Sequence, residues 1–155
     1  MRPYVRALEA RGLSAQAIDL PRSGRSVVKA ERAVQPFIDA VPAGSIAGGH
    51  SYGGRVASMA AVEVSYRALV LLSYPLHRPG HPEDLRTEHW PKIMCPVLLL
   101  SGENDPFARI DLLESSIQLL RQAELVTFPR VGHGLLSVID PAMDRVAAFV
   151  RALKP

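Results

Sequence analysis

The sequence contains a single cysteine, Cys95, so it lacks the pair of thiols that an internal disulfide needs. It also lacks any apolar run that approaches the roughly 18 residues of a membrane-spanning helix. The amino terminus interleaves Arg2, Arg6, Glu9 and Arg11 with apolar residues, and therefore lacks the apolar stretch of a secretion signal. These absences predict a cytoplasmic protein with no membrane partner.

Charge of one sign is not concentrated anywhere along the chain. The 18 basic and 15 acidic residues are mixed and give a net charge of +3, and aromatic residues make up only 6%. A nucleic-acid partner requires a concentrated basic face, so we expect none. Three histidines, His77, His81 and His89, lack the helical spacing and the cysteine or acidic neighbours of a zinc site. We therefore expect no metal and no other cofactor.

The chain does contain short apolar runs that alternate with amphipathic stretches, which is typical of βαβ units. With 155 residues, we expect a single domain, residues 1–155, without a cap domain. The predicted fold class is α/β, with a mostly parallel sheet of about five strands and helices on both faces. The predicted strands are 15–20, 45–49, 68–73, 97–101 and 125–128, and the predicted helices are 4–11, 29–41, 52–64, 110–120 and 143–153. Pro36 should kink the second helix or mark its true start, and the proline-rich segment 74–96 should be irregular.

The pentapeptide Gly49-His50-Ser51-Tyr52-Gly53 lies between a predicted strand and a predicted helix. A serine in that turn is held in a strained backbone conformation, with its hydroxyl above the sheet. We expect Gly49 and Gly53 to leave room for the turn, and Gly54 to let the helix approach the strand. Ser51 is therefore a candidate nucleophile; the alternative is a small residue that the tight turn requires.

A serine nucleophile needs a base and an orienting carboxylate, which in this kind of fold follow it in the order Ser, acid, His. Asp105 follows the predicted strand 97–101, and His133 follows the last one, 125–128. Both segments lie at the carboxyl ends of strands, where α/β folds gather their sites. Glu103, two residues before Asp105, is the alternative acid. We expect His50 to be a packing or supporting group rather than the base.

These motifs resemble a known family. Gly-His-Ser-Tyr-Gly-Gly at 49–54, Gly-x-x-Asp-Pro at 102–106 and Gly-His-Gly at 132–134 are similar to those of small α/β-hydrolases of the dienelactone-hydrolase-like branch. The segments 73–77 and 85–89 resemble a bacterial group within it. The resemblance implies an α/β-hydrolase fold with a Ser51, Asp105 and His133 triad. True dienelactone hydrolases use cysteine where this chain has Ser51, so their substrate is not expected here.

The resemblance also implies an earlier strand and a loop that donates the second N–H of an oxyanion hole. The backbone N–H of Tyr52 is the expected first donor, and the second donor stays unknown because no upstream segment supplies it. In the family's sheet the earlier strand would lie between the strands predicted at 15–20 and 45–49. Either the sheet closes up without it, or the chain is shortened at its amino terminus; we favour the second interpretation. An exposed strand edge there would favour pairing, which leaves a homodimer open.

The predicted activity is that of a serine hydrolase acting on a carboxylic ester, a thioester or a similar acyl bond of a small molecule, although the short amino terminus puts the activity of this chain in doubt. Two alternatives remain: a non-catalytic hydrolase-fold protein that binds a ligand or partner, and an acyltransferase with the same triad. Without a cap domain the pocket should be open. Tyr74, Leu76 and Trp90 are its expected wall residues.

Overall fold

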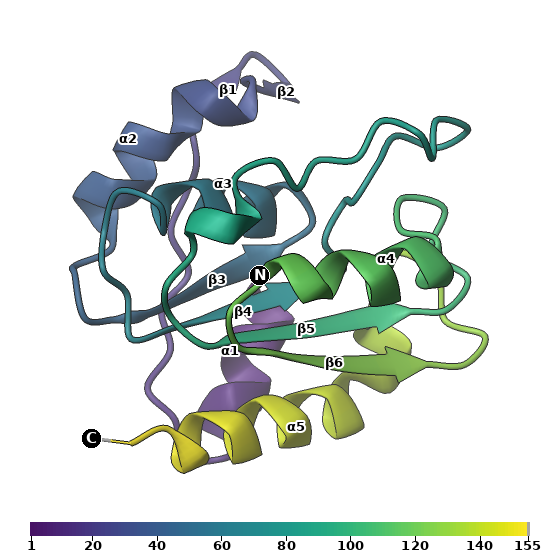
Figure 1. Cartoon of the computed structure of the whole chain (residues 1–155). Helices are drawn as coiled ribbons and strands as arrows, with labels where there is room; N and C mark the ends of the chain where they lie inside the picture. The colour runs from purple at the N-terminus through teal and green to yellow at the C-terminus, as the bar shows by residue number, and fades with distance from the viewer. Residues whose placement is uncertain (155) are drawn as a thin grey trace.

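The computed structural model describes residues 1–154 and is built around a four-stranded parallel sheet. The strands lie in the order β3 (Ile46–His50), β4 (Ala68–Leu72), β5 (Val97–Gly102) and β6 (Ala123–Phe128) (Figure 1). β4 and β5 lie in the middle and are almost fully buried. Their nearly unbroken apolar sequences follow from this position, because helices cover both faces of a parallel sheet. The predicted α/β class and parallel sheet are confirmed.

Helices cover both faces of the sheet, as predicted (Figure 1). One face carries α2 (Ala30–Ala40), α3 (Tyr52–Ala60) and α4 (Ile110–Ser116), and the other carries α1 (Arg2–Glu9) and α5 (Ile139–Ala152). Successive residues of β5 serve the two sides in turn: Leu99 packs with the first group, and Leu98 and Leu100 pack with the second. None of these helices is long and apolar enough to cross a membrane, as far as residues 1–154 are concerned.

The helix predicted over 29–41 forms as α2 and contains Pro36 well inside it. Pro36 therefore does not mark the start of the helix. The segment 74–96 is irregular, as predicted, apart from the short 3-10 helix η1 (Trp90–Lys92). Two further 3-10 turns, η2 (Ile117–Leu119) and η3 (Leu136–Val138), extend the end of α4 and precede α5.

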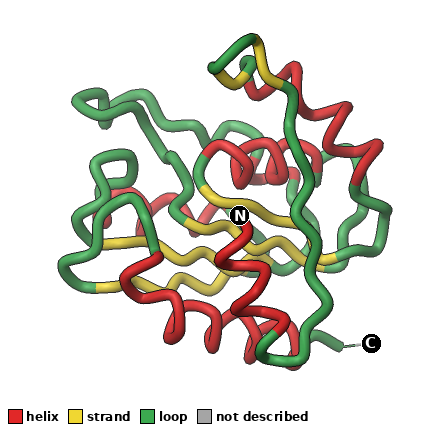
Figure 2. Tube along the Cα trace, turned by 180° about the vertical axis from the view of Figure 1, so that it is seen from behind, coloured by secondary structure: helices red, strands yellow, loops and turns green. Residues whose placement is uncertain are grey.

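The strand predicted over 15–20 does not form, which corrects that expectation. These residues run as a loop from the end of α1 to a small antiparallel hairpin of β1 (Arg22–Ser23) and β2 (Ser26–Val27) (Figure 2). The turn of the hairpin holds Gly24 at φ 62°, a conformation that glycine adopts without strain. A strand is defined by its pairing, and residues 15–20 have no neighbouring strand to pair with.

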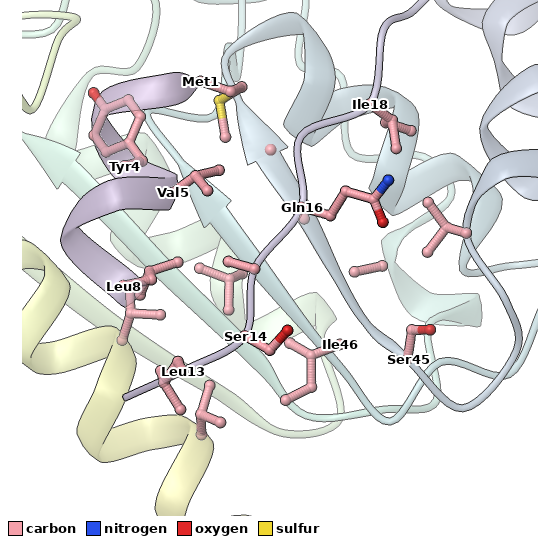
Figure 3. A pocket seen from close by; sticks show the side chains of 18 of the residues that line it. Met1, Tyr4, Val5, Leu8, Leu13, Ser14, Gln16, Ile18, Ser45 and Ile46 are labelled. Carbon is pink, nitrogen blue, oxygen red and sulfur yellow. The ribbon is translucent and has the colours of Figure 1, made fainter. Parts of the chain in front are cut away.

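A cavity of about 530 Å³ separates this loop from β3 (Figure 3). It is lined by side chains of α1, by residues of the loop, such as Leu13 and Ile18, and by β3 itself. β3 pairs only with β4 within residues 1–154, so the edge of β3 that faces the cavity is unpaired. Among residues 1–154, therefore, no strand fills the space between residues 15–20 and β3.

Candidate active site

Ser51 lies in the turn between β3 and α3 with φ 51° and ψ −119°. A non-glycine residue in such a conformation costs about 1–3 kcal/mol, which the surrounding structure must offset. The N–H of Ser51 donates to the carbonyl oxygen of Leu72 at 2.8 Å, which ties the turn to β4. The strained turn thus holds the Ser51 side chain at the carboxyl end of the sheet.

Two of the three glycines around this turn are required by close packing. A Cβ on Gly49 would lie 2.5 Å from the carbonyl carbon of Gly53, and a Cβ on Gly54 would lie 2.9 Å from the carbonyl oxygen of Gly49. The predicted close approach of helix and strand is therefore confirmed at Gly49 and Gly54. The prediction for Gly53 is wrong, because a Cβ there would meet nothing within 4 Å.

Asp105 follows β5 in a tight turn and is almost fully buried. Its Oδ1 accepts a hydrogen bond from the N–H of Phe107 at 2.8 Å, which fixes the carboxylate within its own loop. The loop that carries His133 is held against the same strand end, where the N–H of Asn104 donates to the carbonyl oxygen of Val131 at 2.9 Å. The carbonyls of Val131 and Gly132 approach Gly102 so closely that a side chain there would collide with them.

His133 connects Ser51 and Asp105 by hydrogen bonds. Its Nδ1 lies 2.8 Å from Oδ2 and 2.9 Å from Oδ1 of Asp105, and its Nε2 lies 2.7 Å from the Oγ of Ser51. A carboxylate only accepts, so Nδ1 carries the hydrogen and Nε2 is free to accept from the Ser51 hydroxyl. This chain of contacts lets a serine hydroxyl pass its proton to the imidazole while the carboxylate balances the charge that forms.

Two aromatic side chains support the position of His133. The ring of Phe107 packs at a centroid distance of 4.4 Å, and His50 places its Nε2 3.0 Å from the carbonyl oxygen of His133. His50 itself stacks on Tyr4 of α1 at 5.9 Å. A carbonyl oxygen only accepts, so Nε2 of His50 carries the hydrogen and donates to it. Burial lowers the pKa of His50. His50 thus acts as a supporting group, as expected from its place beside Ser51.

Glu103, the alternative acid, points elsewhere. It is exposed, and its Oε1 accepts a hydrogen bond from the hydroxyl of Thr127 at 2.9 Å. Of the two acids, Asp105 is therefore the one that the fold brings to His133.

A shallow cavity of about 290 Å³ opens beside Ser51. Its lining comes from the hairpin and the start of α2, from the first turn of α3, and from three residues of loops. The lining residues are Val27, Val28, Lys29, Ala30, Ser51, Tyr52, Arg55, Pro75, Arg86 and Phe107.

The expected wall residues Tyr74, Leu76 and Trp90 are not part of this lining. All three are at most 1% exposed and pack into the core on the side of α3. The expectation is corrected: these apolar side chains stabilise the irregular segment 74–96 from within instead of facing the pocket.

Sequence reasoning missed Arg55 and Arg86 as lining residues. Arg55 lies one helical turn after Ser51 in the chain, a spacing that places both on the same side of α3. The spacing therefore relates Arg55 to Ser51 in the sequence alone. No such spacing relates Arg86 to Ser51, because Arg86 lies in the irregular segment 74–96.

The three histidines of the irregular segment have separate partners. The Nε2 of His77 accepts from the N–H of Arg109 at 3.0 Å, and the Nε2 of His89 lies 2.8 Å from the Oγ of Ser58. His81 is exposed and lies 3.2 Å from Glu83. Within residues 1–154, no group of three or more histidine, cysteine, aspartate or glutamate side chains could hold a metal ion.

Comparison with known families places this geometry in a wider group. The family model described as "Alpha/beta hydrolase domain" matches residues 20–144, which include Ser51, Asp105 and His133. The chain belongs to the alpha/beta hydrolase family.

Solved structures of this α/β-hydrolase fold superpose on nearly the whole chain. A dienelactone hydrolase from Anabaena variabilis is 21% identical, with a TM-score of 0.75 over 99% of this chain and 79% of its own. Est1E from Butyrivibrio proteoclasticus, solved with ferulic acid bound, is 16% identical, with a TM-score of 0.75 over 98% of this chain and 82% of its own. At such identities these likenesses show the fold alone.

A curated relative is similar over a shorter stretch. The non-heme chloroperoxidase of Burkholderia pyrrocinia is 38% identical over 72 residues, which are 45% of this chain and 26% of the relative. The match thus spans about a quarter of the length of that relative.

Proposed function

We propose that this protein is a serine hydrolase that cleaves a carboxylic ester, a thioester or a similar acyl bond of a small molecule. The observation that carries the proposal is the chain of hydrogen bonds from Ser51 through His133 to Asp105, with distances of 2.7 and 2.8 Å. Membership of the alpha/beta hydrolase family agrees with this chemistry, and so does a structural neighbour described as an esterase domain from a Rhodothermus marinus protein.

The reaction proceeds in two steps. Ser51 Oγ attacks the acyl carbon while its proton moves to Nε2 of His133, and Asp105 stabilises the imidazolium that forms. His133 then gives this proton to the leaving group, which departs and leaves an acyl group on Ser51. Water enters, loses a proton to His133 and attacks the acyl carbon, and the bond to Ser51 Oγ then breaks to release the acid. His133 returns its proton to Ser51 Oγ, which restores the free serine.

The negative charge that develops on the substrate oxygen needs hydrogen-bond donors. Tyr52 is the first residue of α3, so its N–H has no acceptor within the helix. It lies next to the nucleophile in the chain and at the positive end of the helix dipole. We assign this N–H to the oxyanion hole; one such donor contributes about 10²- to 10³-fold in rate.

The test is the time course of 4-nitrophenyl acetate cleavage at enzyme concentrations high enough to see the first turnover. The proposal predicts a burst of nitrophenol equal to the amount of enzyme, followed by slower steady turnover, and an acetyl group on Ser51 by peptide mass analysis. Ser51→Ala should abolish both. Absence of an acetyl group on Ser51 in a folded wild-type protein would favour the ligand-binding alternative. Adding small alcohols separates the acyltransferase: that enzyme would form acetyl esters in place of acetate.

A further inference from the structure

The cavity beside Ser51 is lined by basic residues and by no acidic ones. Lys29, Arg55 and Arg86 all belong to its lining, and no aspartate or glutamate does. Lys29 is also the N-cap of α2, so the positive end of that helix dipole lies at the cavity wall, where Glu31 of the first turn partly offsets it. The cavity therefore has a positive potential within one helical turn of the proposed nucleophile.

Arg55 is fixed in place but only partly neutralised. It lies on α3, where its N–H donates to the carbonyl oxygen of Ser51 at 3.1 Å. Its Nη2 is paired with Glu31 at 3.2 Å, and that carboxylate is 58% exposed. The Nε of Arg55 is buried and has no hydrogen-bond partner among the described residues. A buried guanidinium nitrogen without an acceptor is costly unless a ligand supplies one.

Arg86 has no carboxylate partner among residues 1–154. Its backbone is held at both ends: its N–H donates to the carbonyl oxygen of Leu76 at 2.8 Å, and its carbonyl oxygen accepts from the hydroxyl of Tyr74 at 2.7 Å. The guanidinium makes one long contact, 3.4 Å from the carbonyl oxygen of Pro75. The chain thus positions the start of this side chain and leaves its charged end without an acceptor of opposite charge.

The two guanidinium groups lie close enough to influence one another. Burial lowers the pKa of Arg86, and the positive charge of Arg55 lowers it further, while Asp84 acts in the opposite direction. Two like charges at the edge of one cavity repel each other, and an anion between them would remove that repulsion. Arginine is also the side chain whose planar donors best match carboxylate and phosphate oxygens.

We propose that Arg55 and Arg86 form an anion subsite beside Ser51, so that the preferred substrates are acyl compounds that carry a carboxylate or phosphate group near the bond to be cleaved. The inference rests on the proposed hydrolase function, because it assigns the substrate class of the same site. Lys29 adds to the potential from the hairpin side, and Glu31 balances Arg55 from outside the cavity.

The test compares three esters: monoethyl glutarate, which carries a carboxylate; 2-(butyryloxy)ethyl phosphate, which carries a phosphate; and ethyl pentanoate, which is neutral. The readout is the ratio of kcat/KM for each anionic ester to that for the neutral one. We expect this ratio to fall about 10- to 100-fold in Arg86→Gln, the usual contribution of hydrogen bonds to a charged group. Whichever anionic ester has the higher ratio in the wild-type protein identifies the group.

Arg78→Gln is the matched control, because Arg78 is exposed, is paired with Asp84 and does not line the cavity. It should leave the ratio unchanged. Equal kcat/KM for all three esters, or a ratio that Arg86→Gln does not change, would overturn the subsite while leaving the hydrolase function intact.

Calorimetric titration with glutarate and with inorganic phosphate keeps the two proposals apart. If an anion binds, and Arg86→Gln weakens this binding while Arg78→Gln does not, the result supports the subsite even when no ester is hydrolysed. Absence of hydrolysis would in that case contradict the hydrolase function and not the subsite. Absence of binding for both anions, together with no preference for anionic esters, would contradict the subsite.

Discussion

Replacing Asp105 by asparagine tests the proposed role of the buried carboxylate with little change in shape. In the native protein, Asp105 accepts from Nδ1 of His133 at 2.8 Å and from the N–H of Phe107 at 2.8 Å. Asparagine has one accepting oxygen and one donating amide. With the oxygen still facing Phe107, the amide would donate to Nδ1 of His133. The hydrogen of the imidazole would then move to Nε2, which could no longer accept the proton of Ser51.

The expected loss of kcat for ester hydrolysis is about 10⁴-fold, or about 5.4 kcal/mol of transition-state stabilisation. The same loss should appear in the second-order rate constant for covalent labelling by a fluorophosphonate, since that reaction also requires an activated Ser51. Circular dichroism and thermal unfolding of the variant check that the fold survives.

Glu103→Gln serves as the control for this substitution. Glu103 lies two residues earlier on the same loop, is exposed and contacts Thr127 instead of His133. We expect its rates to stay within about threefold of the wild type, as for most exposed substitutions. A loss of less than about tenfold in Asp105→Asn, or a larger loss in Glu103→Gln, would refute the assigned roles of these two acids.

Two further predictions concern stability. Gly49→Ala places a methyl group 2.5 Å from the Gly53 carbonyl carbon and should lower the free energy of unfolding by about 1–3 kcal/mol in urea titrations. Gly53→Ala, whose methyl group would meet nothing within 4 Å, should raise the free energy of unfolding slightly. Equal effects of the two substitutions would contradict the packing of the turn. Burial lowers the pKa of His50 and His89 below the ordinary histidine value of about 6.5. As the pH falls, these histidines take up protons in the unfolded chain before they do so in the folded protein. The free energy of unfolding should therefore fall as the pH drops from about 6.5 towards their lower pKa values in the folded protein, and these two groups should not change it with pH above about 6.5. His89→Gln should reduce this fall between about pH 7.5 and about pH 5.5; an unchanged fall would show that His89 is not its source.

Four strands could be predicted from the sequence because each carries its own signal. β4 and β5 are apolar throughout and lie between polar turns, and β3 ends at the Gly-x-Ser-x-Gly turn, so their places differ from the prediction by a residue or two at most. The segment 15–20 has a similar local pattern but forms no strand. Local sequence gives the tendency to extend, whereas a strand needs a neighbour, and that neighbour is a property of the whole fold.

The three residues of the proposed triad could be predicted because their order and their places after strands define one edge of a parallel sheet. The pocket wall could not. Tyr74, Leu76 and Trp90 are expected there because they lie in the irregular segment 74–96, which is too short to form a cap domain, but their apolar surface is equally suited to a core. Arg86 reaches the cavity through an irregular segment, whose path depends on many separate contacts instead of a repeating pattern.

The most direct test of the proposed nucleophile is the intact mass of the protein after treatment with a fluorophosphonate probe. The proposed function predicts one probe per chain on the wild-type protein, attached to Ser51, and none on folded Ser51→Ala. His133→Ala should label too slowly to detect on the same time scale, because Ser51 then has no base. An unlabelled wild-type protein whose fold is intact, or a Ser51→Ala variant that labels as well as the wild type, would contradict the account.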